Sequence, residues 1–159
     1  MRIIDHEIKR YIVRVREFKK KSEDLERAQG TERFQEMAEY MQREERKLAV
    51  MVKKQEKVLF VAFHLLLNLA EDLQIERKMK NRRIISQLIS MLDRNNPDLL
   101  FIVLNFLKKL SIFGENKVEM KECNIVEKLN RFIPCNNQLL LQIALRLLFN
   151  LSFDAEIRN

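Results

Sequence analysis

The sequence has 159 residues, of which 47% are hydrophobic and 33% are charged, a composition that excludes intrinsic disorder and allows one domain with a real core. Two glycines and two prolines are too few for the many tight turns of a β-sandwich or barrel, and they favour long helices. The net charge of +7 arises from acidic and basic residues that are interspersed along the chain, which is typical of solvated helix faces.

Residues 1–57 predict a long antiparallel helical hairpin. Apolar residues recur at spacings of three and four on both sides of Gly30. A heptad seam on both sides of one glycine is typical of two antiparallel helices that pack as a coiled coil. The hairpin is therefore predicted to turn near Gly30 and to continue into the segment that follows it.

The second helix of this hairpin is expected to run from Thr31 to Ala70, about 60 Å at 1.5 Å per residue. That length predicts an arm that projects beyond a single repeat. Polar Ser22, Glu44 and Gln55 interrupt the seam and predict imperfect packing. The arm either presents a surface to a partner or is an insertion without a role.

The segment that follows the hairpin contains an internal repeat. Residues 58–70, 99–111 and 140–152 align without a gap at an offset of 41 residues, and leucine occupies the same three positions in each copy. The segments between them agree at the same offset. A period of 41 falls within the range of roughly 40–47 residues that is typical of HEAT and armadillo repeats.

Each repeat divides into three predicted helices, at about 75–81, 83–94 and 97–111 in the complete copy. Pro97 suits the first position of a helix, where no backbone N–H is needed. Gly114 is expected in a left-handed turn after the third helix. Three helices per repeat favour armadillo over HEAT.

Together these patterns predict an all-α fold, an armadillo-type α-solenoid with the helical hairpin at its N-terminus. Apolar residues would be uncovered at the last repeat, so the sequence is expected to be an excerpt of a longer array. The expected segments are the hairpin (1–57), the third helix of a first repeat (58–72), a second repeat (73–111), a third repeat (112–152) and the start of another (153–159).

Polar residues recur at two positions of each predicted third helix. A spacing of four places both on one helical face, and the offset of 41 stacks these faces along the concave surface of a solenoid. The pattern predicts either a partner-binding groove or the solvated side of amphipathic helices. We call this set the polar ladder; its members are His64, Asn68, Asn105, Lys109, Arg146 and Asn150.

Nothing in the sequence predicts an enzyme, a metal site, a cofactor or a small-molecule substrate. His6 and His64 are the only histidines and Cys123 and Cys135 the only cysteines; they lack metal-ligand spacing, and no glycine-rich phosphate loop is present. The most apolar segment, residues 58–70, is 13 residues long and suits a buried helix better than a membrane span. We therefore expect a soluble intracellular protein without direct membrane insertion.

Several stretches are more specific than a generic armadillo repeat, whose common glycine before the second helix is replaced by Arg82 and Cys123. These stretches are residues 3–7, 54–56, 65–72, 106–113, 124–129, 133–135 and 145–154. Together they resemble the kinesin-associated protein family, the non-motor accessory subunits of heterotrimeric kinesin-II. The resemblance covers nearly the whole chain.

This resemblance implies a non-enzymatic scaffold that binds the tails of the kinesin-II motor subunits. It also implies a link to cargo adaptors in microtubule-based transport, including intraflagellar transport, and a location in the cytoplasm, on microtubules and in the cilium. The alternative is an importin- or catenin-like adaptor that binds an extended peptide, but Lys109 interrupts the series of Asn68 and Asn150. Nucleic-acid binding by the basic residues of 77–83 is disfavoured because no aromatic side chains are interleaved with them.

Overall fold

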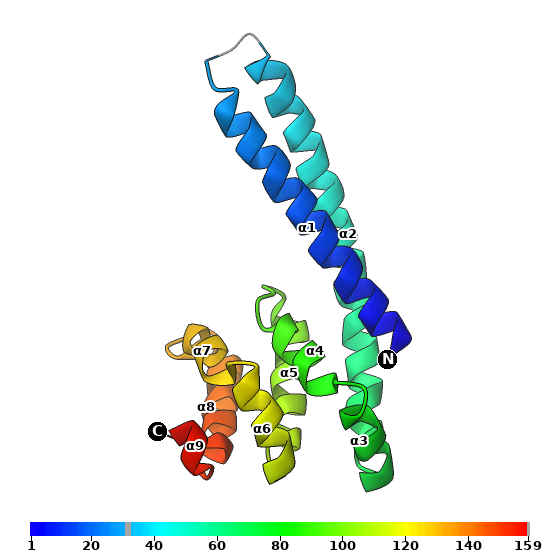
Figure 1. Cartoon of the computed structure of the whole chain (residues 1–159), viewed down its shortest axis with the longest axis vertical. Coiled ribbons are helices and arrows are strands. Elements are labelled where there is room, and N and C mark those ends of the chain that lie inside the picture. Colours follow the sequence, from blue (N-terminus) through cyan, green and yellow to red (C-terminus); the bar gives the residue numbers. More distant parts are fainter. Residues whose placement is uncertain (31–32, 159) are drawn as a thin grey trace. The chain divides into compact units, whose positions relative to one another are not determined.

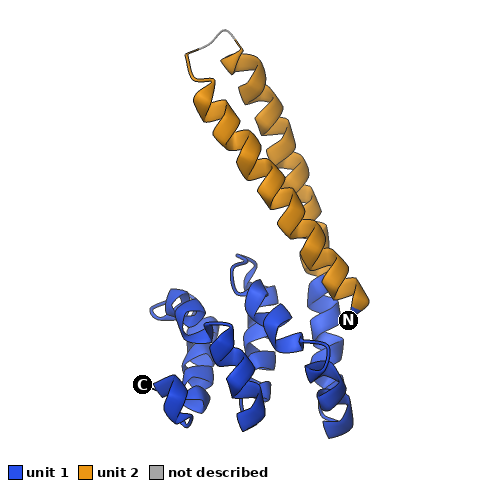
Figure 2. Ribbon diagram, in the orientation of Figure 1, with its two compact units in different colours: residues 1, 59–159 blue, residues 2–58 orange. Residues whose placement is uncertain are grey.

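The structure is a computed structural model that describes residues 1–30 and 33–158. Helices make up 82% of it, and none of the described residues forms a β-strand. The all-α fold class is confirmed. The chain divides into two compact units, unit 2 with residues 2–58 and unit 1 with residues 1 and 59–159 (Figure 2).

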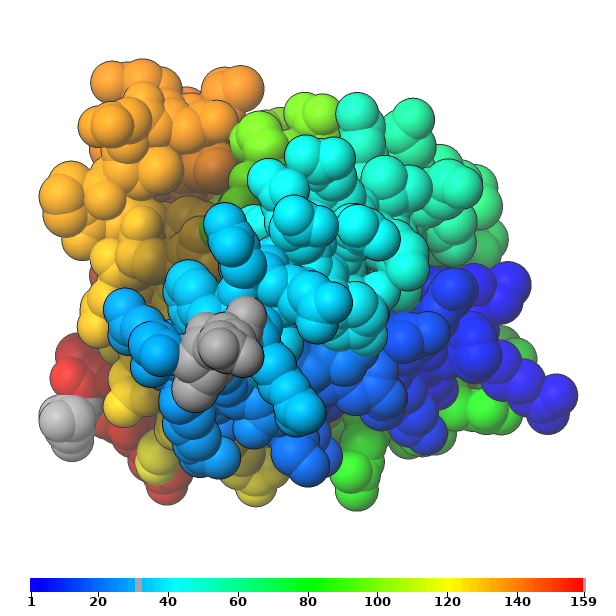
Figure 3. All heavy atoms as spheres, turned by 90° about the horizontal axis from the view of Figure 1, so that it is seen from above, coloured from blue at the N-terminus to red at the C-terminus, as the bar shows by residue number. Residues whose placement is uncertain are grey.

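Unit 2 is a helical hairpin. Helix α1 (Arg2–Arg27) runs in the opposite direction alongside the part of α2 (Phe34–Leu69) that belongs to unit 2 (Figure 1). Atoms of the two helices lie directly against each other in the space-filling view (Figure 3). Gly30, between the helices, has a φ of +88°, a backbone conformation that glycine adopts without steric cost. The expected helix start at Thr31 lies outside the described residues.

Two of the polar residues predicted to interrupt the hairpin seam, Gln55 and Glu44, are hydrogen-bonded. Gln55 is only 3% exposed, and its amide donates to the backbone carbonyl and the carboxylate of Glu7. Glu44 accepts a hydrogen bond from Lys21 Nζ at 3.2 Å. Lys21 Nζ also donates to the hydroxyl of Tyr40 at 2.8 Å. These bonds offset the cost of placing polar atoms in a seam between two helices.

Unit 1 contains the end of α2 and a succession of shorter helices. Helix α5 packs on α8 and on α4, and α4 packs on α6. The long α5 contributes more buried residues than any other described helix, and its Leu99, Val103 and Phe106 are fully buried. The helices that follow α2 are α3 (Leu73–Lys80), α4 (Ile84–Met91), α5 (Pro97–Leu110), α6 (Gly114–Glu122), α7 (Ile125–Leu129), the 3₁₀ turn η1 (Asn130–Phe132), α8 (Gln138–Ser152) and α9 (Ala155–Arg158).

Local conformations recur at the same 41-residue offset as the sequence. Asn96 and Asn137 cap the N-termini of α5 and α8, and each side chain accepts from two backbone N–H groups. Such caps satisfy donors that a helix leaves unpaired in its first turn. Arg83 and Asn124 precede α4 and α7, with left-handed φ values of 55° and 54°.

An ion pair also recurs at this offset. Lys80 Nζ lies 2.6 Å from Glu115 Oε2 and joins α3 to α6, and Lys121 Nζ lies 2.9 Å from Glu156 Oε2 and joins α6 to α9. The hydrogen bond from Lys80 and its positive charge lower the pKa of Glu115. Equivalent contacts thus link successive first helices of the predicted repeats.

The expectation for Gly114 was wrong. Helix α6 begins at this residue, and Gly30, not Gly114, is the described glycine with positive φ. The chain passes from α5 to α6 through Ser111 and Phe113 in ordinary right-handed and extended conformations, so no left-handed residue is needed there. The left-handed positions fall instead at Arg83 and Asn124.

Candidate functional site

The polar ladder is carried by three helices of unit 1, with His64 and Asn68 on α2. Asn105 and Lys109 lie on α5, and Arg146 and Asn150 lie on α8. Because α5 packs on α8, the structure brings the last four residues onto neighbouring helices. His64 and Asn68 lie on a helix outside that pair.

Asn150 is tied to the end of α5. Its Nδ2 donates to the backbone carbonyl of Lys108 at 3.2 Å and to Ser111 Oγ at 3.0 Å. Ser111 is fully buried, and its hydroxyl donates to the same Lys108 carbonyl at 2.7 Å. An asparagine amide has two hydrogens. Both are used within the chain, so Asn150 offers a partner only its carbonyl oxygen.

Asn105 is also engaged within its own helix. Its Nδ2 donates to the backbone carbonyl of Phe101 at 3.1 Å, and its Oδ1 accepts from Lys108 Nζ at 3.2 Å. Lys108 therefore belongs to the surface around the polar ladder, although the four-residue spacing did not select it. The adjacent pair Lys108 and Lys109 was the sequence signal that could have identified it.

The remaining charges of this surface are unbalanced. Lys108, Lys109 and Arg146 form no ion pair with any described residue. The two lysines are half-buried and Arg146 is exposed. Neighbouring cations without carboxylates create a positive potential that attracts anionic groups. The α5–α8 face can therefore bind carboxylates and hydrogen-bond acceptors of a partner.

The two ladder residues on α2 have different surroundings. His64 and Asn68 are both exposed. The His64 ring stacks on the ring of Phe60, with centroids 6.1 Å apart and planes 18° apart. A stacked imidazole on an exposed helix offers a flat, partly apolar contact and two ring nitrogens.

The described residues show no arrangement that would hold a metal ion. Within residues 1–30 and 33–158, no three histidine, cysteine, aspartate or glutamate side chains gather in one place. In the same part of the chain, no helix combines the length and the apolar character that a bilayer crossing requires. The polar ladder combines cations, side-chain amides and an imidazole, which are groups that suit contact with a partner's surface.

The chain was compared with protein families and with solved structures. No solved structure matches it. The family model described as kinesin-associated protein (KAP) matches residues 1–159, and it agrees with the resemblance carried by the repeat segments. The chain therefore belongs to the kinesin-associated protein (KAP) family, a family of kinesin accessory proteins.

Proposed function

We propose that this protein is a non-enzymatic scaffold whose α5–α8 face binds the tails of kinesin-II motor subunits. The observation that carries the proposal is the group of three cations, Lys108, Lys109 and Arg146, which lack carboxylate partners among the described residues. Family membership supplies the class of partner. Acidic segments of a motor tail would complement this face and gain affinity and association rate from it.

The same proposal includes an armadillo-type solenoid that links the motor to cargo adaptors. The 41-residue recurrence supports it, since caps at Asn96 and Asn137 and left-handed residues at Arg83 and Asn124 repeat with the sequence. A stack of repeats presents an extended surface on which two partners can bind at once. In this role the protein acts in the cytoplasm, on microtubules and in the cilium.

An importin- or catenin-like adaptor that reads the backbone of an extended peptide fits this surface less well. Such reading needs free amide hydrogens, and both hydrogens of the Asn150 amide are used by Lys108 and Ser111. Lys109 stands at the equivalent position of the preceding repeat. The proposed recognition therefore rests on charge.

The test compares motor-tail binding by the native chain and by the triple variant Asn105→Ser, Lys109→Ser, Arg146→Ser. Fluorescence anisotropy with labelled kinesin-II tail segments should show affinity reduced by about tenfold or more, because contacts to the partner are lost. Raising the salt concentration should weaken the native complex more than the variant complex, since two cations have been removed. Each substitution should change stability by no more than about 0.5 kcal/mol.

The matched control replaces one asparagine, one lysine and one arginine elsewhere on unit 1, in the variant Lys78→Ser, Asn81→Ser, Arg82→Ser. All three control residues are exposed. The control should bind the tails like the native chain. Native affinity in the ladder variant, with both variants melting normally, would refute the α5–α8 face as the binding site.

A further inference from the structure

A groove runs along one side of the hairpin in unit 2. It consists of two adjoining hollows of about 340 and 540 Å³, which share Arg10, Lys47 and Met51 as lining residues. Its walls are residues 7–21 of α1 and residues 44–58 of α2, and we call it the hairpin groove. It lies in another unit than the polar ladder.

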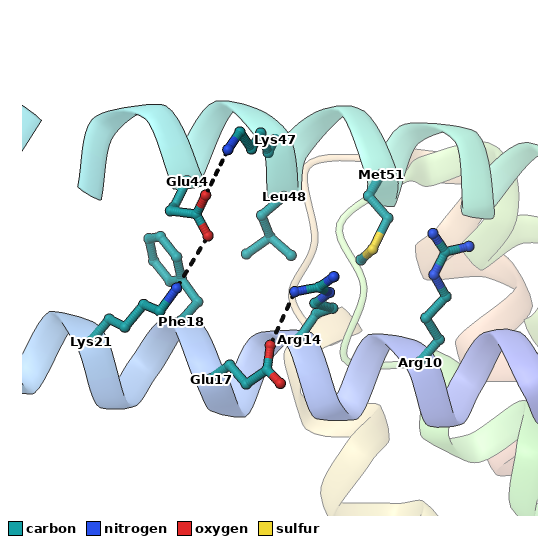
Figure 4. A pocket seen from close by; sticks show the side chains of 9 residues that line it. All are labelled: Arg10, Arg14, Glu17, Phe18, Lys21, Glu44, Lys47, Leu48 and Met51. Carbon is teal, nitrogen blue, oxygen red and sulfur yellow. Dashed lines mark hydrogen bonds and ion pairs between the residues drawn. The ribbon is translucent and has the colours of Figure 1, made fainter. Parts of the chain in front are cut away.

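The floor of the hairpin groove is apolar and only partly covered. Phe18 rises from α1, and Leu48 and Met51 point from α2 toward α1 between charged side chains (Figure 4). These three side chains are half-buried, although they belong to the apolar seam. On the α2 wall, Val50 is 55% exposed and Val58 is 46% exposed. Two helices cannot enclose such a seam, and one further helix would complete its burial.

The walls carry more positive than negative charge. Of the 15 lining residues, six are lysine or arginine and three are glutamate, so this small part of the chain holds an excess of three in a total of +7. The acids already have partners in the groove. Glu44 accepts from Lys21 and Lys47, Glu17 accepts from Arg14, and Glu7 accepts from Gln55.

Two cations of the α2 wall remain available. Arg46 and Lys54 form no ion pair with any described residue, and both are exposed. They lie eight residues apart, about two turns along α2. Carboxylates at matching positions of a partner would find charged donors beside the apolar floor.

The two helical walls offer an occupant no free backbone hydrogen-bonding groups, and this favours an occupant that is itself a helix. Both walls are helices, whose backbone groups bond internally away from their ends. An extended peptide on the apolar floor would leave its own N–H and C=O groups without partners. A helix satisfies its backbone internally and buries an apolar stripe. Residues 44–58 of α2 cover 15 residues, about 21 Å, which corresponds to about four helical turns.

We propose that the hairpin groove binds one acidic amphipathic helix of a partner protein, which completes a three-helix bundle with α1 and α2. The apolar stripe of the partner covers Phe18, Leu48 and Met51, and its carboxylates pair with Arg46 and Lys54. This surface would make the hairpin a docking arm. The proposal does not depend on the polar ladder, and its failure would leave the proposed function of unit 1 standing.

The experiment titrates the full chain, labelled with ¹³C at the methionine methyl groups, with synthetic peptides of about 18 residues, long enough to form a helix. The first has leucines at alternating three- and four-residue spacing and glutamates on both flanks. The second is a scramble of the same composition, and the third has lysine in place of glutamate. The first should move the Met51 methyl resonance, while Met79 and Met120 of unit 1, which are buried, should not move.

A charge-reversal variant tests whether Arg46 and Lys54 contribute to binding. Arg46→Glu with Lys54→Glu should weaken binding of the acidic peptide by tenfold or more, whereas the matched control Lys53→Glu with Lys57→Glu should weaken it much less. Lys53 and Lys57 lie on the same helix but do not line the groove. Circular dichroism should give the same helix content for both variants.

The opposite results would overturn the proposal. Equal binding of the scrambled peptide would indicate unspecific charge attraction, and equal loss in the control variant would place the contact outside the groove. A Met51 shift caused by phosphatidylserine vesicles and not by the acidic peptide would assign the groove to a membrane surface. Binding of the lysine peptide as tightly as the glutamate peptide would exclude the role of the cations.

Discussion

Asn116 joins three helices inside unit 1, and its truncation gives a sharp test of the packing. Its Nδ2 donates to Glu76 Oε1 of α3 at 3.2 Å and to the carbonyl of Leu110, at the end of α5, at 3.0 Å. Asn116 is 4% exposed and Glu76 is 7% exposed. Asn116→Ala therefore removes a donor from two acceptors that have little access to water.

The expected loss of stability follows from the two hydrogen bonds that the substitution removes. A hydrogen bond to a carbonyl contributes roughly 0.5–1.5 kcal/mol and one to a charged group roughly 1.5–3 kcal/mol. Asn116→Ala should thus lower the free energy of unfolding of unit 1 by about 2–4 kcal/mol. If the free energy of unfolding falls by about 2 kcal/mol per molar urea, the urea concentration at the unfolding midpoint should fall by about 1–2 M. Asn130→Ala, at an exposed position, should change stability by at most about 0.5 kcal/mol.

The assay separates the two units by their chromophores. Tyr11 and Tyr40 are the two tyrosines of the chain, which contains no tryptophan, and both lie in unit 2. Circular dichroism reports both units, so the variant should shift the dichroism transition and leave the tyrosine fluorescence transition in place. A loss in Asn116→Ala no larger than in Asn130→Ala would refute the reasoning, as would an equal shift of the tyrosine signal.

Three further predictions follow from burial. Met41→Asp with Leu48→Asp should unfold the hairpin and leave residues 73–152 resistant to limited proteolysis, because both residues belong to the apolar seam; loss of both regions together would contradict this. Leu107→Ala should cost roughly 2–5 kcal/mol in urea unfolding, since Leu107 is fully buried, and a cost below about 1 kcal/mol would be inconsistent with a packed core. The pKa of Cys123 is raised, first by burial and then by nearby carboxylates of α6, so mass spectrometry should show slower alkylation at pH 8 in the folded chain than in urea. Equal rates would contradict the burial.

The sequence predicted those elements whose signals are local. The period of three and four placed the long helices, and Pro97 marked the start of α5, where the structure also begins it. The expected second helix of the repeat, 83–94, is shorter in the structure, where α4 ends at Met91. Pro97 restricts only the residue directly before it, and Asn96 is accordingly extended and caps α5.

Other features depend on contacts between distant residues. The left-handed conformation of Arg83 could not be predicted from the sequence, because arginine rarely adopts positive φ, whereas asparagine, as at Asn124, adopts it more readily. The bond between Asn150 and Ser111 needs the packing of α8 on α5. The hairpin groove likewise requires both helices, since neither heptad pattern alone shows how far its apolar residues remain uncovered.

Residues at equivalent positions of the repeat thus have different roles. The amide of Asn150 stabilises the end of α5, whereas the ammonium of Lys109, one repeat earlier, has no carboxylate partner among the described residues. Truncating Asn150 should therefore mainly lower the free energy of unfolding, because the buried Ser111 hydroxyl and the Lys108 carbonyl lose their donor. Truncating Lys109 should mainly lower the affinity for an acidic partner and reduce the salt dependence of that affinity. In the proposed function, recognition at this face depends on the cations that the packing leaves free, and the amide of Asn150 contributes by joining α8 to the end of α5.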